Sequence, residues 1–255
     1  MGAQPAGGVV VTAAPAGPVL SARSVLSVRS VTRRLGGVAV VNGVDLDLAP
    51  GQVTALVGPN GAGKSVLLDC LSGVARPDGG RILLGARDVT RAPCHRRARL
   101  GLARTFQQVA VFPGLTVAQN VLVGAEHHGA TGAVGRTRVA GVLRLLGLAE
   151  LAAHPVAGLP LGVLRLVELG RALAGGPRVL LVDEVSVGLD AAQVAWVAQV
   201  LAMTAEEGAA VLLVEHDLAL VARLAHRAYV LDTGRVVTTG TIAEVLADER
   251  VRRLW

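Results

Sequence analysis

An α/β fold with a mostly parallel core sheet is the fold class that this 255-residue sequence predicts, on three observations. Residues 179–182 and 210–214 are fully apolar, have the length of buried strands and each lead into charged residues. Residues 53–57 form a third apolar strand, which leads into a glycine-rich turn. Segments with the apolar spacing of helices alternate with these strands, and this alternation is typical of a parallel sheet. In such sheets, ligands gather at the carboxyl ends of the strands.

The composition indicates a core of small aliphatic side chains. Apolar residues make up 52% of the chain but aromatic residues only 2%, so Ala, Val, Leu and Gly supply the packing. A chain of this length can bury a sizeable core, as one large domain or two small ones. Residues 1–21, mostly Ala, Gly, Pro and Val with almost no charge, are interpreted as a disordered N-terminal extension. We interpret residues 22–255 as the folded part.

The first strands of the folded part are expected to form a small antiparallel sheet beside the core. Residues 25–31 have a strand-like pattern, and residues 44–48 alternate strictly between apolar and acidic side chains. Residues 81–84 form a further short strand after a Pro-Asp-Gly-Gly turn.

A phosphate-binding loop follows the strand at 53–57. The turn has the form G-x-x-x-x-G-K-S, and the helix after it, with apolar residues at helical spacing, should end at Gly73. A strand, this turn and a helix together form the phosphate-binding loop of nucleotide hydrolases, in which backbone N–H groups and the helix N-terminus face the phosphates. We expect Lys64 to reach the β- and γ-phosphates and the Ser65 hydroxyl to hold Mg²⁺. The predicted nucleotide-binding residues are Gly58, Pro59, Asn60, Gly61, Ala62, Gly63, Lys64, Ser65, Val66 and, from a later strand, Asp183.

The alternative for this stretch is an ordinary glycine-rich turn between a strand and a helix. Both flanks argue against it, because the strand and the helix are each in place. Lys64 is also the only lysine of the chain, whose other basic residues are all arginine apart from six histidines.

Three helices are predicted in the middle of the chain, over residues 116–125, 136–148 and about 163–174. A glycine-rich break at 129–135 separates the first two, and the Gly-Gly-Pro sequence at 175–177 is a good stop signal for the third.

Acidic and imidazole side chains come directly after two buried strands. In a phosphate-loop hydrolase the strand-terminal carboxylate, here Asp183, positions Mg²⁺, often through water. The adjacent Glu184 can accept the proton of the attacking water. His216 follows the strand at 210–214. The alternatives are a strand that ends in solvated acids and a structural histidine.

The net charge of +6 leaves an acidic surface, anionic lipid or nucleic acid conceivable as a partner. The arginines are dispersed except over residues 91–99, and few aromatic residues accompany them, so we expect no nucleic-acid partner. An arginine-rich, solvated surface is the simpler interpretation.

The remaining composition favours a cytoplasmic protein. No apolar run approaches the 18 to 20 residues of a membrane span, and the prolines near the N-terminus argue against a signal peptide. Cys70, in the helix after the phosphate loop, and Cys94, in a basic loop, are expected to be free thiols in a reducing compartment.

The order of these motifs resembles the ATP-binding subunit of ABC transporters over residues 24–255. Gln107, in Arg-Thr-Phe-Gln, is similar to the family's Q-loop glutamine; residues 180–184 resemble its Walker B strand and residues 188–190 its D-loop. His216 is similar to the switch histidine at the γ-phosphate. The resemblance implies an ABC ATP-binding domain over 22–255 with a helical subdomain at about 108–176. It also implies ATP and Mg²⁺ as cofactors, Glu184, His216 and Gln107 as catalytic residues, and Ser65, Gln107 and Asp183 as metal-binding residues.

A narrower resemblance is to the branched-chain amino acid uptake subfamily, which also includes urea and amide importers. The sequences at 104–107, 111–122 and 214–217, with Arg165 and Glu168 in the frame of the third helix, carry this resemblance. It implies a second ATPase subunit, two transmembrane permease subunits, indirectly an extracytoplasmic solute-binding protein, and a peripheral position at the cytoplasmic face of the membrane. A coupling helix of the permease is expected to dock near Gln107, Phe112 and the helix at Thr116.

The chain departs from the family at the signature loop, where Leu-Ser-x-Gly-Gln becomes Leu-Pro-Leu-Gly-Val at residues 159–163. In the family this loop donates hydrogen bonds to the γ-phosphate bound by the other chain of a head-to-tail dimer. Pro160 lacks the hydroxyl and the N–H, and Val163 lacks the amide, although proline is compatible with a helix start. We therefore expect a heterodimer with one working site, built on Lys64. The alternative is that these changes inactivate the protein. Leu35 also replaces the aromatic residue that stacks on adenine.

The function that the sequence favours is ATP hydrolysis that powers solute import. One alternative is a catalytically impaired, nucleotide-binding regulatory subunit. Others are a soluble ABC protein of DNA repair or translation, which normally carries a second nucleotide domain or a long coiled-coil insertion, and an exporter ATPase.

Overall fold

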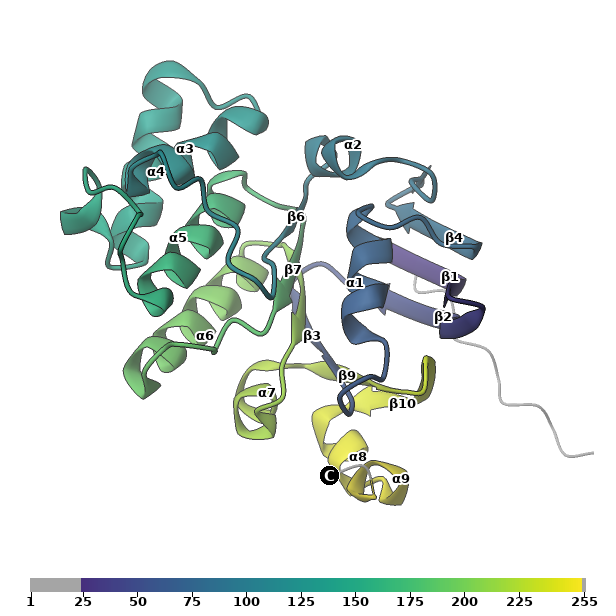
Figure 1. Ribbon diagram of the computed structural model, residues 1–255. Helices are drawn as coiled ribbons and strands as arrows, with labels where there is room; N and C mark the ends of the chain where they lie inside the picture. Colours follow the sequence, from purple (N-terminus) through teal and green to yellow (C-terminus); the bar gives the residue numbers. More distant parts are fainter. Residues whose placement is uncertain (1–23, 254–255) are drawn as a thin grey trace, which may run out of the picture.

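The computed structural model describes residues 24–253 and shows a central sheet with helices on both sides (Figure 1). The predicted N-terminal extension, residues 1–21, lies outside the described residues. No helix within residues 24–253 combines the length and the apolar character that crossing a membrane requires.

The core sheet has six strands in the order β10-β9-β3-β8-β7-β6, and only β10 runs antiparallel to its neighbour. The three apolar segments of the sequence form its centre, and every residue of β7 and β8 is buried. The mostly parallel core sheet is therefore confirmed. The strands are β3 (Gln52–Val57), β6 (Leu102–Arg104), β7 (Val179–Asp183), β8 (Ala210–Val214), β9 (Arg227–Asp232) and β10 (Arg235–Thr241).

The predicted antiparallel sheet is present, with four strands in the order β2-β1-β4-β5. Its first two strands are longer than predicted, because a turn at Gly36 and Gly37 joins them directly and bulges interrupt their alternation. One irregularity lies between Val28 and Val31, at Ser30, which has a φ of 49°. The strands are β1 (Leu26–Leu35), β2 (Val38–Leu48), β4 (Gly79–Leu84) and β5 (Arg87–Asp88).

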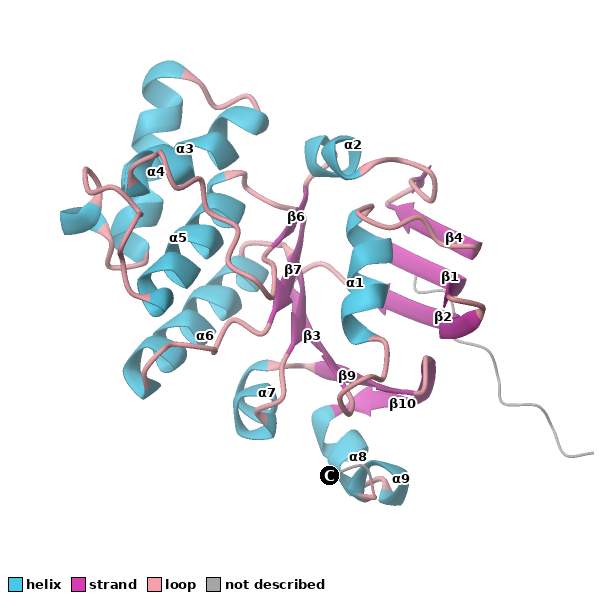
Figure 2. Cartoon of the chain, viewed as in Figure 1, coloured by secondary structure: helices cyan, strands magenta, loops and turns pink. Residues whose placement is uncertain are grey.

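Helix α1 (Lys64–Ser72) lies between the two sheets (Figure 2). Leu67, Leu68 and Leu71 are fully buried in one apolar cluster with side chains of both sheets. The helix ends as predicted at Gly73, whose φ of 83° suits a glycine C-cap. The burial of these leucines holds α1 against both sheets, so that the N-terminus of the helix stays next to the phosphate loop at the end of β3.

The predicted helices of the middle of the chain pack together on the opposite side of the core sheet from α1 (Figure 1). They are α3 (Val117–His127), α4 (Gly132–Leu145) and α5 (Leu161–Ala174), with a short 3₁₀ turn, η1 (Ala149–Leu151), between α4 and α5. The remaining helices are α2 (Cys94–Arg99), α6 (Ala191–Glu206), α7 (Leu218–Leu224), α8 (Ile242–Ala247) and α9 (Glu249–Arg252).

The predicted boundaries of the second helix were wrong at both ends. Helix α4 begins at Gly132, inside the supposed glycine-rich break, and ends at Leu145. Gly135 lies in its first turn. A glycine is required there, because a Cβ would stand 2.3 Å from the carbonyl oxygen of Ala130. This glycine serves close packing and does not interrupt the helix.

The arginine-rich stretch at 91–99 is not wholly solvated. Residues 94–99 form α2, so Cys94 begins a helix and does not lie in a loop. Arg97 is 1% exposed, and its guanidinium donates to the carbonyl oxygens of Cys70 at 2.6 Å and Leu71 at 2.7 Å. Its other donors reach the carbonyl oxygens of Ala92 and Thr90. Arg97 thereby satisfies carbonyl groups at the end of α1 that no helical partner can reach.

Both cysteines are free thiols, as predicted. Burial raises the pKa of the Cys70 thiol to about 11, so this side chain behaves as a small apolar group of the core.

Replacing Arg97 by methionine should lower the free energy of unfolding by about 2–4 kcal/mol, because several buried carbonyl groups lose their donor. Urea denaturation measures the effect. Arg99→Met is the matched control, since Arg99 is exposed on the same helix and should change stability by less than about 0.5 kcal/mol. Equal stability of the two variants would contradict a capping role for Arg97.

Candidate nucleotide-binding and hydrolysis site

The turn between β3 and α1 has the tight geometry of a phosphate cradle. Gly58, Gly61 and Gly63 have φ values of 155°, 81° and 103°, which favour glycine. A Cβ at Gly58 would lie 2.0 Å from the carbonyl oxygen of Leu231, and one at Gly63 2.4 Å from that of Val40. These two glycines allow the loop to approach neighbouring strands, whereas Gly61 faces open space.

Lys64 is folded back over the loop that it follows. Its ammonium donates to the carbonyl oxygens of Gly58 at 2.6 Å and Pro59 at 3.0 Å, and the residue is 6% exposed. Burial lowers the pKa of Lys64, and the carboxylates of Glu184 and Asp183 oppose that shift. A phosphate group in the cradle would offer this cation a stronger partner than two carbonyl groups.

A cavity of about 220 Å³ opens at this loop, and the three predicted catalytic side chains also line it. Gly58, Pro59 and Asp183, which were also predicted to bind the nucleotide, do not line this cavity, and Asp183 is buried. Leu35 does not border it, and its side chain is exposed. The lining residues are Val40, Asn60, Gly61, Ala62, Gly63, Lys64, Ser65, Val66, Gln107, Glu184 and His216.

Glu184 is held between the two other predicted catalytic side chains. Its Oε1 lies 2.9 Å from Nε2 of His216, and its Oε2 accepts from Nε2 of Gln107 at 3.1 Å. The backbone of Glu184 has a φ of 48°, a left-handed conformation that is rare for a non-glycine residue. Strained residues of this kind cluster at active sites. The three side chains come from loops after β6, β7 and β8, at the carboxyl edge of the sheet.

Asp183 is buried, and one of its carboxylate oxygens is unpaired. Oδ2 accepts from Nη2 of Arg104 at 3.3 Å, while Oδ1 has no hydrogen-bond partner. Burial raises the pKa of Asp183 and the Arg104 guanidinium opposes that shift. An orphaned, buried carboxylate oxygen beside the cradle fits a role in holding a cation, directly or through water.

No cluster of three or more His, Cys, Asp or Glu side chains within residues 24–253 could hold a metal ion. The predicted metal-binding set of Ser65, Gln107 and Asp183 contains one carboxylate, so it does not depend on such a cluster. A magnesium ion at this site would take its further oxygen ligands from phosphate and water.

Two side chains of α5 hold the backbone at Gln107, a role that the sequence analysis missed. The guanidinium of Arg165 donates to the carbonyl oxygens of Phe106 and Gln107. The carboxylate of Glu168 accepts from the backbone N–H of Phe106 at 3.0 Å. Both side chains are buried, whereas the sequence alone indicated these residues only through a family resemblance. An arginine and a glutamate three residues apart on an otherwise apolar helix face were the available signal.

Arg104 was also missed as a link within the site. Besides Asp183, its guanidinium reaches Oδ1 of Asp69 at 2.6 Å and lies 5.0 Å from the ring centre of Phe106. It therefore joins α1, β7 and the loop that carries Gln107.

The departure at residues 159–163 lies at the start of α5. Pro160 is the N-cap residue, and no side-chain hydrogen bond caps the helix there. The prediction that proline is compatible with a helix start is confirmed, since α5 begins at Leu161. A Cβ at Gly162 would stand 2.5 Å from the carbonyl oxygen of Gly188, so this loop packs tightly against the segment that follows β7.

Residues 41–187 match the sequence profile of a family described as "ABC transporter", which covers more than half of the chain. The chain belongs to the ABC transporter family. It is therefore an ABC ATPase, and the hydrolysis of ATP is the activity of this domain family.

Curated relatives resemble this ABC ATPase over most of its length. It is 32% identical to the high-affinity branched-chain amino acid transport ATP-binding protein LivG of Escherichia coli (strain K12), over 90% of this chain and 96% of the relative. It is 33% identical to the corresponding protein BraF of Pseudomonas aeruginosa, with 88% and 94% covered. A ribose import ATP-binding protein of Rubrobacter xylanophilus is 36% identical over 91% of this chain, which spans 47% of that protein.

Solved structures confirm the fold class. A nucleotide-free ATP-binding cassette from an ABC transporter superimposes with a TM-score of 0.81 at 25% identity, over 91% of this chain and 98% of that one. The ADP conformation of an ATP-binding cassette gives a TM-score of 0.79 at 26% identity, with the same coverage. ABC ATPases thus bind adenine nucleotides on this fold.

Proposed function

We propose that this ABC ATPase is the subunit that binds and hydrolyses ATP to power solute import. The single observation that carries the proposal is the convergence of Gln107, Glu184 and His216 on the cavity at the phosphate loop. A structural histidine or a pair of solvated acids would not require this arrangement.

In the proposed reaction the phosphates of ATP lie on the loop over 58–65, and Lys64 exchanges its carbonyl partners for phosphate oxygens. Ser65, Gln107 and Asp183 would hold Mg²⁺, which when bound neutralises charge on the phosphates. Glu184 accepts the proton of the attacking water, and His216 donates a hydrogen bond toward the γ-phosphate. Asn60 to Ser65 contribute backbone N–H groups at the N-terminus of α1.

The solute is proposed to be a branched-chain amino acid or a related small polar compound. The names of the LivG and BraF relatives support this class, whereas the relative from Rubrobacter xylanophilus is named for the import of ribose, a sugar. Transport then requires two transmembrane permease subunits at the cytoplasmic face of the membrane, and indirectly an extracytoplasmic solute-binding protein.

A mostly apolar groove of about 500 Å³ supports the docking of a permease segment. It lies between α2, α3 and α5, and Val74, Ala98, Phe106, Val123 and Ala172 are among its lining residues. Phe106 directly precedes Gln107, so a segment in this groove would act on the loop of the catalytic site.

Turnover in the assembled complex tests this function. ATP hydrolysis should depend on Mg²⁺ and should rise when the chain is assembled with its permease subunits in liposomes, because the docked permease positions the loop at Gln107. No hydrolysis in either state, with ATP still bound, would favour the second candidate: a nucleotide-binding regulatory subunit with negligible turnover. The uncapped N-terminus of α5 at Pro160 is the observation that favours that candidate.

We further propose that the chain works in a heterodimer. In a head-to-tail dimer, the loop at 159–163 faces the nucleotide of the partner, while the site at Lys64 receives the signature loop of the partner. Pro160 offers neither a hydroxyl nor an N–H. The site built on Lys64 is therefore the working one, and the opposite site mainly holds ATP.

Restoring the signature loop should accelerate hydrolysis in a homodimer of this chain. Pro160→Ser with Val163→Gln returns two side-chain donors, and one preorganised donor is worth roughly a hundred-fold in rate. The kcat of the purified homodimer measures the gain. Pro160→Ala with Val163→Ala is the matched control, because it removes the ring and returns the backbone N–H at position 160 but adds no side-chain donor. Equal rates for the two double variants would contradict this account of the loop.

A further inference from the structure

Glu215 is a buried carboxylate directly before His216 that does not border the nucleotide cavity. It is 2% exposed, and both of its oxygens accept hydrogen bonds from a single residue, Ser186. Oε1 accepts from the backbone N–H of Ser186 at 3.0 Å, and Oε2 accepts from its hydroxyl at 2.9 Å. Burial raises the pKa of Glu215, and the hydrogen bonds from Ser186 oppose that shift. A buried carboxylate is costly, so its retention here calls for a role.

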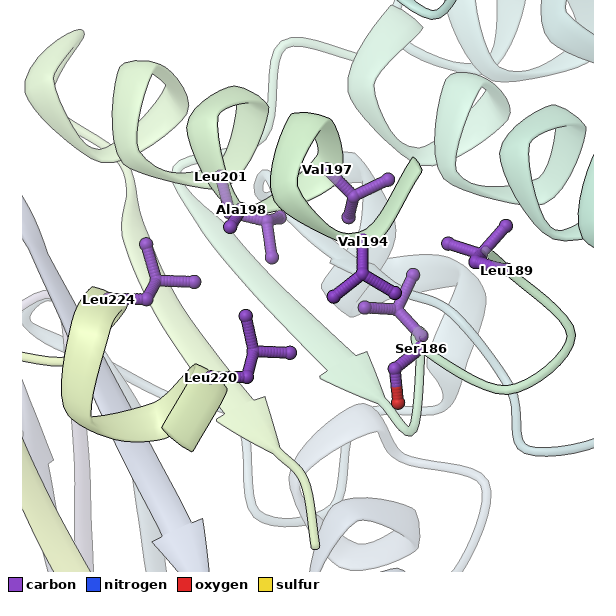
Figure 3. Close-up of a pocket in the computed structure, with 9 residues that line it drawn as sticks. Ser186, Leu189, Val194, Val197, Ala198, Leu201, Leu220 and Leu224 are labelled. Atoms are coloured by element: carbon purple, nitrogen blue, oxygen red, sulfur yellow. The ribbon is translucent and has the colours of Figure 1, made fainter. Parts of the chain in front are cut away.

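Ser186 lies at the start of the segment that leads from β7 to α6 (Figure 3). Its hydroxyl points away from α6, while Leu189 and Val194 lie among apolar side chains of α6 and α7. The gap that these side chains border is too small for a water molecule. Apolar packing therefore fixes one side of the segment, and Glu215 fixes the polar side.

Two sets of hydrogen bonds hold the backbone around Glu184, and both connect it to residues 214 and 215. The backbone N–H of Glu184 donates to the carbonyl oxygen of Val214 at 2.9 Å. Two residues later, Ser186 is bound to Glu215. The left-handed backbone of Glu184 costs on the order of 1–3 kcal/mol, so it persists only where its surroundings hold it.

We propose that Glu215 is a positioning residue that holds the turn at Glu184 and sets the position of its carboxylate against His216. Val214, Glu215 and His216 are consecutive, so one rigid stretch carries both the anchors of Glu184 and its imidazole partner. The 2.9 Å separation of Glu184 Oε1 and His216 Nε2 follows from that arrangement. This inference rests on the proposed function, in which Glu184 accepts the proton of water.

The chemistry of the clamp predicts which replacement preserves it. Glutamine can accept the N–H of Ser186 with its oxygen and donate to the serine hydroxyl with its nitrogen, because a hydroxyl is both donor and acceptor. Alanine can do neither. The charge of Glu215 is therefore dispensable, whereas its two hydrogen bonds are not.

The test compares steady-state ATP hydrolysis by the full chain, in its permease complex, for Glu215→Gln, Glu215→Ala and Ser186→Ala. A misplaced catalytic group costs up to about a hundred-fold, so Glu215→Ala should lower kcat by about ten- to a hundred-fold with KM for ATP within about threefold. Glu215→Gln should stay within about threefold of the unmodified chain. Ser186→Ala, which keeps the backbone donor, should fall between them.

Two further measurements separate positioning from a general loss of structure. Adding Ser186→Ala to Glu215→Ala should cost little more than Glu215→Ala alone, because both remove one clamp. The dissociation constant of ATP, measured on each purified variant, should remain within about threefold. Glu244→Ala is the matched control, since Glu244 also accepts from a backbone N–H, at 2.7 Å, but on α8. It should leave kcat unchanged.

The inference is overturned if Glu215→Ala keeps full kcat, if Glu215→Gln loses as much as Glu215→Ala, or if all variants lose ATP binding and kcat together. The proposed function fails separately, if the unmodified chain hydrolyses no ATP or if Glu184→Gln hydrolyses it at the full rate. Normal hydrolysis that depends on Glu184 but not on Glu215 would leave the proposed function intact and reject the positioning role.

Discussion

Replacing Glu184 by glutamine should lower the rate of ATP hydrolysis by about a hundred-fold to ten-thousand-fold, which is the range for loss of a general base. Glutamine has the same shape, so the hydrogen bonds with Gln107 and His216 can be kept while the proton acceptor is lost. The variant also removes a negative charge near Lys64. ATP should therefore bind as tightly as to the unmodified chain, or more tightly.

Two measurements check this expectation: phosphate release under saturating ATP, and the dissociation constant of ATP by calorimetry. Gln193→Glu, in the first turn of α6, is a control that exchanges an amide for a carboxylate outside the cavity. It should leave both quantities within about twofold. Undiminished phosphate release from Glu184→Gln would remove Glu184 from the reaction and leave the water to be activated by another group.

The strands and the phosphate loop could be predicted because short-range patterns specify them. β8 coincides with the apolar run over 210–214, and α1 ends at the glycine that the sequence indicates. The order of loop, carboxylates and histidine along the chain was also sufficient to place Lys64, Glu184 and His216 at one sheet edge. The rule that ligands gather at the carboxyl ends of parallel strands does not need the details of packing.

The links between these residues could not be predicted, because they depend on side chains that reach backbone groups far away in the sequence. Arg165 contacts the carbonyl oxygen of Gln107 across 58 positions, and Arg97 reaches the end of α1 across 26 and 27. Local pattern predicts a solvated arginine at position 97, and at position 165 it does not indicate which backbone groups the side chain reaches. The left-handed backbone of Glu184 is equally invisible, since no glycine marks it.

Replacing Lys64 by alanine should weaken ATP binding by about a hundred-fold, because a charge-assisted hydrogen bond contributes about 1.5–3 kcal/mol and this ammonium would make more than one to phosphate. Hydrolysis should be lost with it. The chain has no other lysine, and within residues 24–253 no other cationic side chain borders the cavity, His216 aside. No neighbouring group can therefore take over the role. Calorimetric titration with ATP measures the affinity.

Lys64→Arg separates the charge from its geometry. Arginine keeps the positive charge, but its planar guanidinium is larger than an ammonium and cannot occupy the same position over the carbonyl oxygens of Gly58 and Pro59. It should bind ATP more weakly than the unmodified chain and better than Lys64→Ala. Because Lys64 also satisfies those two carbonyl groups without nucleotide, both variants need a thermal unfolding scan without ATP. Full ATP affinity in a folded Lys64→Ala protein would place the phosphates elsewhere than on this loop.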